Sequence, residues 1–183
     1  SLFNEANITD DLLCIIYSSA YNKTTNCELA EAQRKNIPCL LYSQALGQLS
    51  AHAYSCGIAG VHGKTTTTGL TGTILQQFDL PVQVLAGSLI SSFGGSKPQD
   101  SLGKQGSCTL NQGTDFFVAE TCEYQRHFMD FHPKKIILTS VESDHQDFFP
   151  TYEDILSAFV DYICLLPENG QLIYCADDAG ACE

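Results

Sequence analysis

The chain has 183 residues, of which 44% are hydrophobic and 16% are charged, and no stretch is of low complexity. These values exclude a disordered or fibrous protein, because enough apolar side chains are present to bury a core. The net charge of −12 argues against a general nucleic-acid binder, and the apolar runs are too short for a membrane span of roughly 18 residues.

Short apolar runs alternate with helical patterns in the first part of the chain. Residues 12–17 read as a strand buried on both faces, a helix capped by Asn26 follows, and residues 37–42 form a second strand. Ser43 is expected to cap the next helix, which ends near residue 54. This β-α-β-α order predicts an α/β fold with a parallel sheet.

The alternation continues to the end of the chain. The expected elements are a strand at 55–59, a helix at 64–77, a strand at 82–86, a long loop at 88–113, strands at 115–119 and 135–140, a helix at 152–166 capped by Thr151, and a strand at 171–176. Loops as long as the expected one are usually functional or mobile. We place the domain boundary so that residues 1–52 belong to one domain and 53–183 to a second, nucleotide-binding one.

Nine cysteines are present, an odd number, and no pair has the C-x-x-C spacing. Several lie inside apolar runs, so we expect buried, reduced thiols without zinc, as in a cytoplasmic protein. The chain begins with Ser1 and its only methionine is Met129, from which we expect a piece of a longer protein.

A glycine-rich segment, GVHGKTTTT at 60–68, lies between an expected strand and an expected helix. Glycines let backbone N–H groups converge on an anion, and the helix N-terminus adds its positive end. Lys64 can reach the β- and γ-phosphates of a nucleotide, and the Thr65 hydroxyl can bind Mg²⁺. The long form of this motif has glycine where Ile58 stands, so the loop is a shortened one; a purely structural turn is the alternative. The residues expected to hold the phosphates are Gly60, Val61, His62, Gly63, Lys64, Thr65 and Thr66.

Acidic residues follow two further strands, at the carboxyl edge where parallel sheets place their ligands. Glu120 can complete a Mg²⁺ shell or pair locally, and we expect Glu123 to support the site or the fold. The segment 142–147 contains His145 among acids and reads as a metal-binding or a plain surface loop. Ten acids lie in residues 142–183, which form a solvated surface or gather Mg²⁺. Arg126 suits a substrate carboxylate or phosphate, or a simple surface ion pair.

Three segments together, GVHGKTTTT at 60–68, AETCEYQRHF at 119–128 and TSVESDHQDFF at 139–149, resemble the Mur ligases of peptidoglycan synthesis. Residues 15–49, with SSA after one strand and NIP before the next, resemble the end of that family's Rossmann-like UDP-binding domain. The resemblance implies a partial UDP-sugar domain followed by an incomplete P-loop ATPase domain, with the amino-acid-binding domain outside this chain.

The alanine-adding members of the family are the most similar. This resemblance implies a reaction in which the lactyl carboxylate of UDP-N-acetylmuramate attacks ATP to give an acyl phosphate. L-Alanine then converts the acyl phosphate to an amide. By resemblance Lys64 contacts phosphate, and Mg²⁺ is held by Thr65, Glu120 and His145. The substrate-contacting candidates are Ser18, Ser19, Arg126 and His127.

Several sister enzymes use a carbamylated lysine about 15 residues after the histidine. This chain has no lysine after Lys135, which agrees with an alanine-adding member. A murein peptide ligase, which joins a recycled peptide to the same sugar nucleotide, and a non-catalytic P-loop module or simple P-loop kinase remain alternatives.

Overall fold

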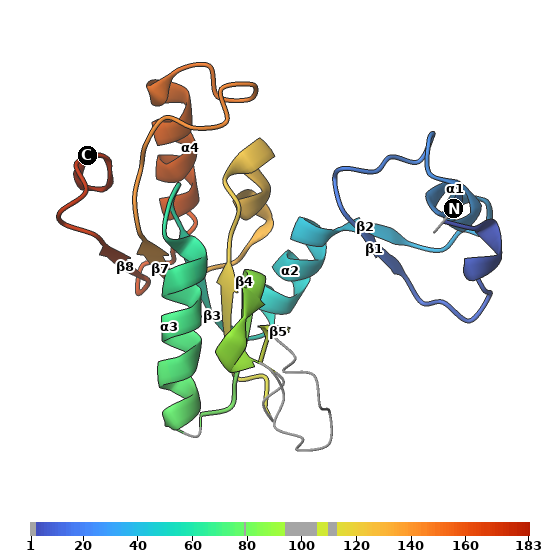
Figure 1. Ribbon diagram of the computed structural model, residues 1–183, viewed down its shortest axis with the longest axis horizontal. Helices are drawn as coiled ribbons and strands as arrows, with labels where there is room; N and C mark the ends of the chain where they lie inside the picture. Colours follow the sequence, from blue (N-terminus) through green and yellow to red (C-terminus); the bar gives the residue numbers. More distant parts are fainter. Residues whose placement is uncertain (1–2, 79, 94–105, 110–112) are drawn as a thin grey trace. The chain divides into compact units, whose positions relative to one another are not determined.

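The computed structural model describes residues 3–78, 80–93, 106–109 and 113–183. The chain divides into two compact units, Ser1–Gln48 and Leu49–Glu183 (Figure 1). The helix α2 (Tyr42–Ala51) begins in the first unit and ends in the second. Among the described residues, no helix is long and apolar enough to cross a membrane.

The first unit contains a parallel pair of strands and a helix. Its elements before α2 are η1 (Glu5–Asn7), β1 (Ile15–Tyr17), α1 (Cys27–Arg34) and β2 (Cys39–Leu41), with β1 parallel to β2. The predicted cap is confirmed, because the Asn26 side chain accepts hydrogen bonds from the N–H groups of Glu28 and Leu29. Two of its basic side chains are paired with acids: Arg34 Nη2 lies 2.5 Å from Glu31 Oε1, and Lys35 Nζ lies 2.7 Å from Asp10 Oδ1.

Two predictions for the first unit are wrong. The strand that was expected to be buried on both faces is largely exposed, with Ile16 at 55% and Leu13 at 90%. The residues of β1 alternate between half-buried and exposed, so only one face of the strand is covered in the described chain. Ser43 does not cap α2, because β2 leads directly into a helix that already starts at Tyr42.

The second unit is built on a six-stranded sheet in the order β5-β4-β6-β3-β7-β8. All neighbouring strands are parallel except β4 and β5, which confirms the predicted α/β fold. The elements are β3 (Tyr54–Ala59), α3 (Lys64–Gln77), β4 (Val82–Ile90), η2 (Ser91–Phe93), β5 (Gly106–Cys108), β6 (Phe116–Glu120), η3 (Tyr124–Asp130), β7 (Lys135–Leu138), α4 (Tyr152–Ile163), β8 (Gln171–Tyr174) and η4 (Gly180–Cys182).

The sheet order decides where the site lies. The strand β3 runs between β6 and β7, with Ile58 opposite Glu120 and Ala59 opposite Leu138. The loops that follow these three strands therefore leave the same edge of the sheet side by side. They are the three segments that contain the candidate residues.

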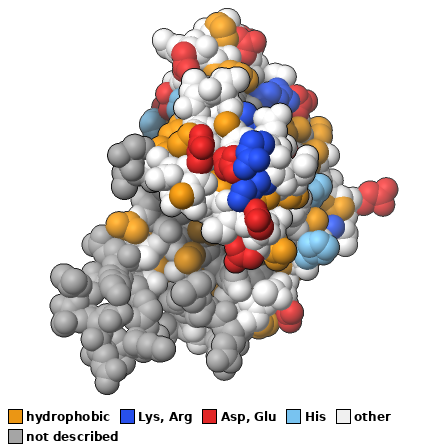
Figure 2. All heavy atoms as spheres, turned by 90° about the vertical axis from the view of Figure 1, so that its right-hand side faces the viewer, with side chains coloured by type: hydrophobic (Ala, Val, Ile, Leu, Met, Phe, Trp, Pro, Cys, Tyr) orange, Lys and Arg blue, Asp and Glu red, His pale blue; other side chains and the backbone are white. Residues whose placement is uncertain are grey.

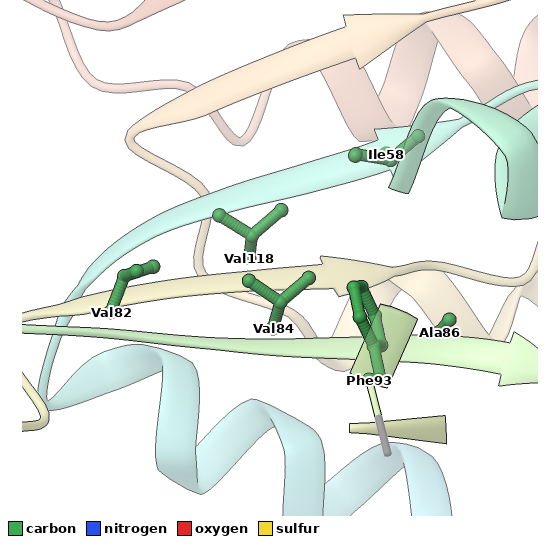
Figure 3. Close-up of a cluster of buried hydrophobic side chains, with 6 residues drawn as sticks. All are labelled: Ile58, Val82, Val84, Ala86, Phe93 and Val118. Carbon is green, nitrogen blue, oxygen red and sulfur yellow. The ribbon is translucent and has the colours of Figure 1, made fainter. Parts of the chain in front are cut away.

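The helices α3 and α4 cover opposite faces of this sheet. On the α3 face, a Cβ added to Gly72 would lie 2.5 Å from the Phe93 ring, so small residues let the helix approach the cluster of Ile58, Val82, Val84, Ala86, Phe93 and Val118 (Figure 3). On the other face, a Cβ at Gly57 would lie 2.1 Å from the Tyr162 hydroxyl of α4. Successive strand residues point to opposite faces, which is why Gly57 and Ile58 face different helices. Thr151 caps α4 as predicted, in a reciprocal arrangement with Asp154.

The long loop expected at 88–113 is partly structured. The strand β4 continues to Ile90, and η2 and the antiparallel β5 follow within the predicted loop. The segments 94–105 and 110–112 lie outside the described residues.

The cysteines are free and none is fully buried, which corrects the expectation of buried thiols. Cys14, Cys122, Cys164, Cys175 and Cys182 are exposed, and the other four are half-buried. The apolar runs that suggested burial belong to elements at the edge of a sheet, such as the strand β8, whose four residues are all exposed.

On the molecular face drawn in Figure 2, basic side chains lie beside acidic ones.

Candidate active site

The glycine-rich loop between β3 and α3 depends on two glycines in conformations that other residues rarely adopt. Gly60 has φ 132° and Gly63 has φ 81°. A Cβ added to Gly60 would lie 2.1 Å from the Thr139 hydroxyl oxygen. The loop can therefore curl only because both positions are glycine.

The end of β7 holds this loop in place. The N–H of Val61 donates to the Ser140 carbonyl at 3.0 Å, and the N–H of His62 donates to the Ser140 hydroxyl at 2.9 Å. The Thr139 hydroxyl contacts the His62 carbonyl at 2.5 Å. Two polar residues at one strand end thus fix a loop that comes from the neighbouring strand.

The N-terminus of α3 is open toward the loop. Gly63 occupies the cap position and makes no side-chain cap hydrogen bond. The first N–H groups of a helix have no intrahelical acceptor and carry part of the positive end of the helix dipole. An anion held by the loop therefore meets the N–H groups of Lys64, Thr65 and Thr66, which is the arrangement that binds phosphate.

The Lys64 ammonium is folded back into the loop. Its Nζ donates to the carbonyls of Gly60 at 2.5 Å and Val61 at 3.2 Å, and to Glu123 Oε1 at 3.0 Å. The side chain is 15% exposed, so its charge is held close to the loop rather than in solvent.

Glu120 and Thr65 form a second centre beside the first. The Thr65 hydroxyl lies 2.9 Å from Glu120 Oε2, and the N–H of Gly87 donates to the same oxygen at 2.7 Å. A Cβ at Gly87 would lie 2.8 Å from Glu120 Oε1, so a larger residue there would push the carboxylate away from its present position. One carboxylate and one hydroxyl are hard oxygen donors, and Mg²⁺ at phosphate sites is commonly bound by such a pair together with substrate phosphate. The donor set fits that ion.

His145 lies with Glu123 rather than with Glu120. Its Nε2 is 3.5 Å from Glu123 Oε1 and 3.9 Å from Asp144 Oδ2, and its backbone has φ 51°. The Tyr124 ring lies 4.8 Å from the imidazole, centroid to centroid. In the described part of the chain, no group of three or more His, Cys, Asp or Glu side chains could hold a metal ion.

The expected trio of metal ligands is therefore divided between two contacts. Thr65 meets Glu120, and His145 meets Glu123 together with Lys64. Glu123, expected only to support the site or the fold, connects the loop lysine to the histidine and is 1% exposed. The only hint of this central position in the sequence is that Glu123 follows Glu120 by three residues.

The four substrate candidates are placed in different ways. Arg126 forms the simple ion pair of the alternative interpretation, with its Nη2 2.5 Å from Asp161 Oδ2. His127 is half-buried on η3. Ser18 and Ser19 are exposed and belong to the first unit, whereas the other site residues belong to the second.

Two other side chains border the site. His62 is 71% exposed, and its Nε2 lies 4.0 Å from Glu142 Oε2. The Tyr124 hydroxyl donates to Asp147 at 2.7 Å, and this hydrogen bond raises the pKa of the tyrosine above its usual value. The tyrosine stays protonated and keeps its ring beside His145.

Comparison with known proteins matches residues 58–182 to the Mur ligase middle domain. The UDP-N-acetylmuramate–L-alanine ligase of Treponema pallidum (strain Nichols) is 49% identical over 181 residues, which is 99% of this chain and 35% of that protein. The enzyme of the same name from Borreliella burgdorferi is 44% identical over 164 residues, covering 90% of this chain and 33% of that protein. The chain thus spans about a third of the length of these curated relatives.

Two solved structures share the fold. The UDP-N-acetylmuramate-alanine ligase of Thermotoga maritima gives a TM-score of 0.73 at 20% identity, over 97% of this chain and 38% of that one. The UDP-N-acetylmuramate:L-alanyl-gamma-D-glutamyl-meso-diaminopimelate ligase from Neisseria meningitides gives 0.72 at 24% identity, over 97% of this chain and 56% of that one. Because the Mur ligase middle domain matches more than half of its residues, the chain belongs to the Mur ligase family.

Proposed function

We propose that this chain is the nucleotide-binding part of an ATP-dependent ligase that joins L-alanine to UDP-N-acetylmuramate. The observation that carries the proposal is the open N-terminus of α3, with Lys64 on one side and the Thr65–Glu120 pair on the other. The high identity to alanine ligases over nearly the whole chain supports the choice of substrates.

The residues of this chain have separate tasks in that reaction. The N–H groups at the start of α3 bind the phosphates of ATP, and Lys64 moves from Glu123 to a phosphate oxygen. Thr65 and Glu120 would hold Mg²⁺, which neutralises charge on the transferred group when bound. His145, a metal ligand by resemblance, and Lys64 both contact Glu123.

The chemistry is carboxylate activation. A lactyl carboxylate oxygen forms a bond to the γ-phosphorus, and the bond to the leaving ADP breaks. The L-alanine amine then attacks the carbonyl carbon of the acyl phosphate, phosphate leaves, and the amine loses its proton to give the amide. The enzyme's contribution is orientation and charge neutralisation, which phosphoryl transfer mainly requires. Because the reaction consumes ATP, we place it in the cytoplasm.

Phosphate release by the full-length protein containing this chain tests the proposal. Release should require ATP, UDP-N-acetylmuramate and L-alanine together. It should fall at least a hundredfold in Lys64→Ala, while the matched variant Lys134→Ala, at an exposed lysine outside the site, keeps the parent rate.

Two other results would support the alternatives. Rapid release with L-alanyl-γ-D-glutamyl-meso-diaminopimelate in place of L-alanine would indicate a murein peptide ligase. ATP turnover that ignores the muramate substrate would indicate a P-loop kinase or simple ATPase, and no turnover with any of these substrates would indicate a non-catalytic module.

A further inference from the structure

We propose that Glu123 is a positioning residue that holds the Lys64 ammonium and the His145 imidazole in one arrangement and is the counter-charge that nucleotide phosphate replaces. The inference deepens the proposed function and rests on it for the identity of the reaction. It concerns an acid that neither binds the Thr65 hydroxyl nor lies on the sheet.

Glu123 is the most deeply buried acid of the site. It is 1% exposed, and carboxylates are rarely buried to this extent unless they are paired. A tight turn directs it inward: the N–H of Arg126 donates to the Glu123 carbonyl at 2.8 Å, and Gln125 and Arg126 both have positive φ, at 51° and 57°. Non-glycine residues rarely adopt such angles, so the fold accepts strain at the turn that carries this side chain.

The two partners of Glu123 come from different elements. Lys64 begins α3 after β3, and His145 lies in the loop after β7, whereas Glu123 follows β6. Lys64 Nζ is 3.0 Å from both carboxylate oxygens, and His145 Nε2 is 3.5 Å from Oε1. One carboxylate thus connects the loops that follow three adjacent strands.

The two acids of the site, Glu120 and Glu123, have different partners. Glu120 is engaged by the Thr65 hydroxyl and the Gly87 N–H, which are neutral donors. Glu123 faces the two side chains that are or can be cationic, and its Oε2 accepts no well-aligned hydrogen bond from any described residue. Lys64 is therefore the main charge compensation of this buried carboxylate, and an incoming phosphate would compete with Glu123 for the same ammonium.

The arrangement also suits a histidine that binds a metal. Metal-binding histidines usually give one ring nitrogen to a carboxylate, which fixes the orientation of the ring. Glu123 Oε1 lies 3.5 Å from Nε2 of His145, close enough to become such a partner after a small shift, and the Tyr124 ring packs against the imidazole. Removing the charge of Glu123 would therefore take away the anionic partner of Lys64, which would keep only the carbonyls of Gly60 and Val61, and would loosen His145 in one step.

The variant Glu123→Gln keeps the shape and removes the charge, and the full-length protein is the test object. Calorimetric titration with Mg²⁺ and the non-hydrolysable analogue AMP-PNP should show binding at least twofold tighter than in the unmodified protein, because the competing carboxylate is gone. The kcat for phosphate release should nevertheless fall at least tenfold, because Lys64 and His145 are no longer oriented. A smaller fall in kcat, or equal or weaker binding, overturns the inference, since a merely structural role weakens binding and activity together.

Two further variants make the outcome decisive. Glu168→Gln removes an exposed acid before β8 and should leave both the Kd for AMP-PNP and the kcat unchanged, which controls for net charge.

Glu123→Asp keeps the charge on a shorter side chain and should have a higher kcat than Glu123→Gln. Equal kcat values overturn the inference. Should Glu123→Gln not fold, Glu123→Asp alone decides: a lowered kcat at an unchanged Kd supports the inference, and an unchanged kcat overturns it. If unmodified protein binds AMP-PNP but does not ligate, the proposed function fails while the binding comparison still tests Glu123.

Discussion

Replacing Gly60 by alanine tests how the phosphate-type loop is held. The new Cβ would lie 2.1 Å from the Thr139 hydroxyl oxygen and 2.8 Å from the Ser140 backbone nitrogen, at a φ of 132°. The strained backbone costs about 1–3 kcal/mol. Displacing the Thr139 hydroxyl, which lies within reach of the carbonyls of Ala59 and His62, loses one hydrogen bond of about 0.5–1.5 kcal/mol, because a hydroxyl donates a single hydrogen.

Gly63 provides the matched control. Its φ is 81°, but a Cβ there would have no neighbour closer than 3.7 Å, so Gly63→Ala introduces strain without a clash. Gly60→Ala should therefore be less stable than Gly63→Ala by roughly 0.5–1.5 kcal/mol, the lost hydrogen bond.

Thermal unfolding of the two full-length variants measures the difference. For a unit of this size, 1 kcal/mol corresponds to about 2–4 °C, so Gly60→Ala should melt roughly 1–6 °C below Gly63→Ala. Equal melting temperatures would refute the view that Thr139 and Ser140 hold the loop.

Three further predictions follow from the site and its surroundings. Thr65→Val should lower the rate of phosphate release about a hundredfold and raise the Mg²⁺ concentration needed for half-maximal rate, measured by metal titration, whereas an unchanged Mg²⁺ requirement would exclude Thr65 as a ligand. Arg126→Ala should cost less than about 1 kcal/mol in a melting experiment, because the pair with Asp161 is at the surface, and a KM for UDP-N-acetylmuramate equal to the parent's would remove Arg126 from the substrate site. All nine cysteines should titrate as free thiols in unfolded protein, and Cys56 should react most slowly in folded protein below pH 9, because burial raises its pKa to about 11. The neutral thiol is favoured in the folded state, so the stability from Cys56 should be complete below pH 9 and lost towards pH 11; a melting profile that Cys56→Ala leaves unchanged over this range would contradict that burial.

The alternation of apolar strands and helices was sufficient to predict the five parallel strands of the sheet in the second unit. The helix from Lys64 to Gln77 was predicted at its observed bounds, because glycine and lysine mark its start. The cap at Thr151 could also be predicted, because helix capping depends only on residues that are close in sequence.

Features that depend on distant partners were not predictable in the same way. The apolar run of β1 suggested burial, yet burial depends on what lies above and below the strand. The strand β5 was missed because Gly-Ser-Cys has no strand pattern and is ordered by pairing with β4.

In the candidate site, too, the contacts between residues that are distant in sequence could not be predicted. The convergence of the three loops on one edge was predicted from strand ends, but the grouping within it was not. The inward turn at Gln125 and Arg126 places Glu123 between Lys64 and His145, and no local pattern announces two successive positive φ angles in non-glycine residues. The close approach of Gly87 to Glu120 likewise arises from strand pairing between β4 and β6.

The most direct test of the central claim, carboxylate activation by ATP, is an isotope transfer experiment. UDP-N-acetylmuramate labelled with ¹⁸O in the lactyl carboxylate is converted by the full-length protein with ATP, Mg²⁺ and L-alanine, and the released phosphate is analysed by mass spectrometry. Attack of the carboxylate on the γ-phosphorus followed by amide formation transfers one ¹⁸O to each phosphate. Phosphate that carries no ¹⁸O while the amide product accumulates would contradict the account.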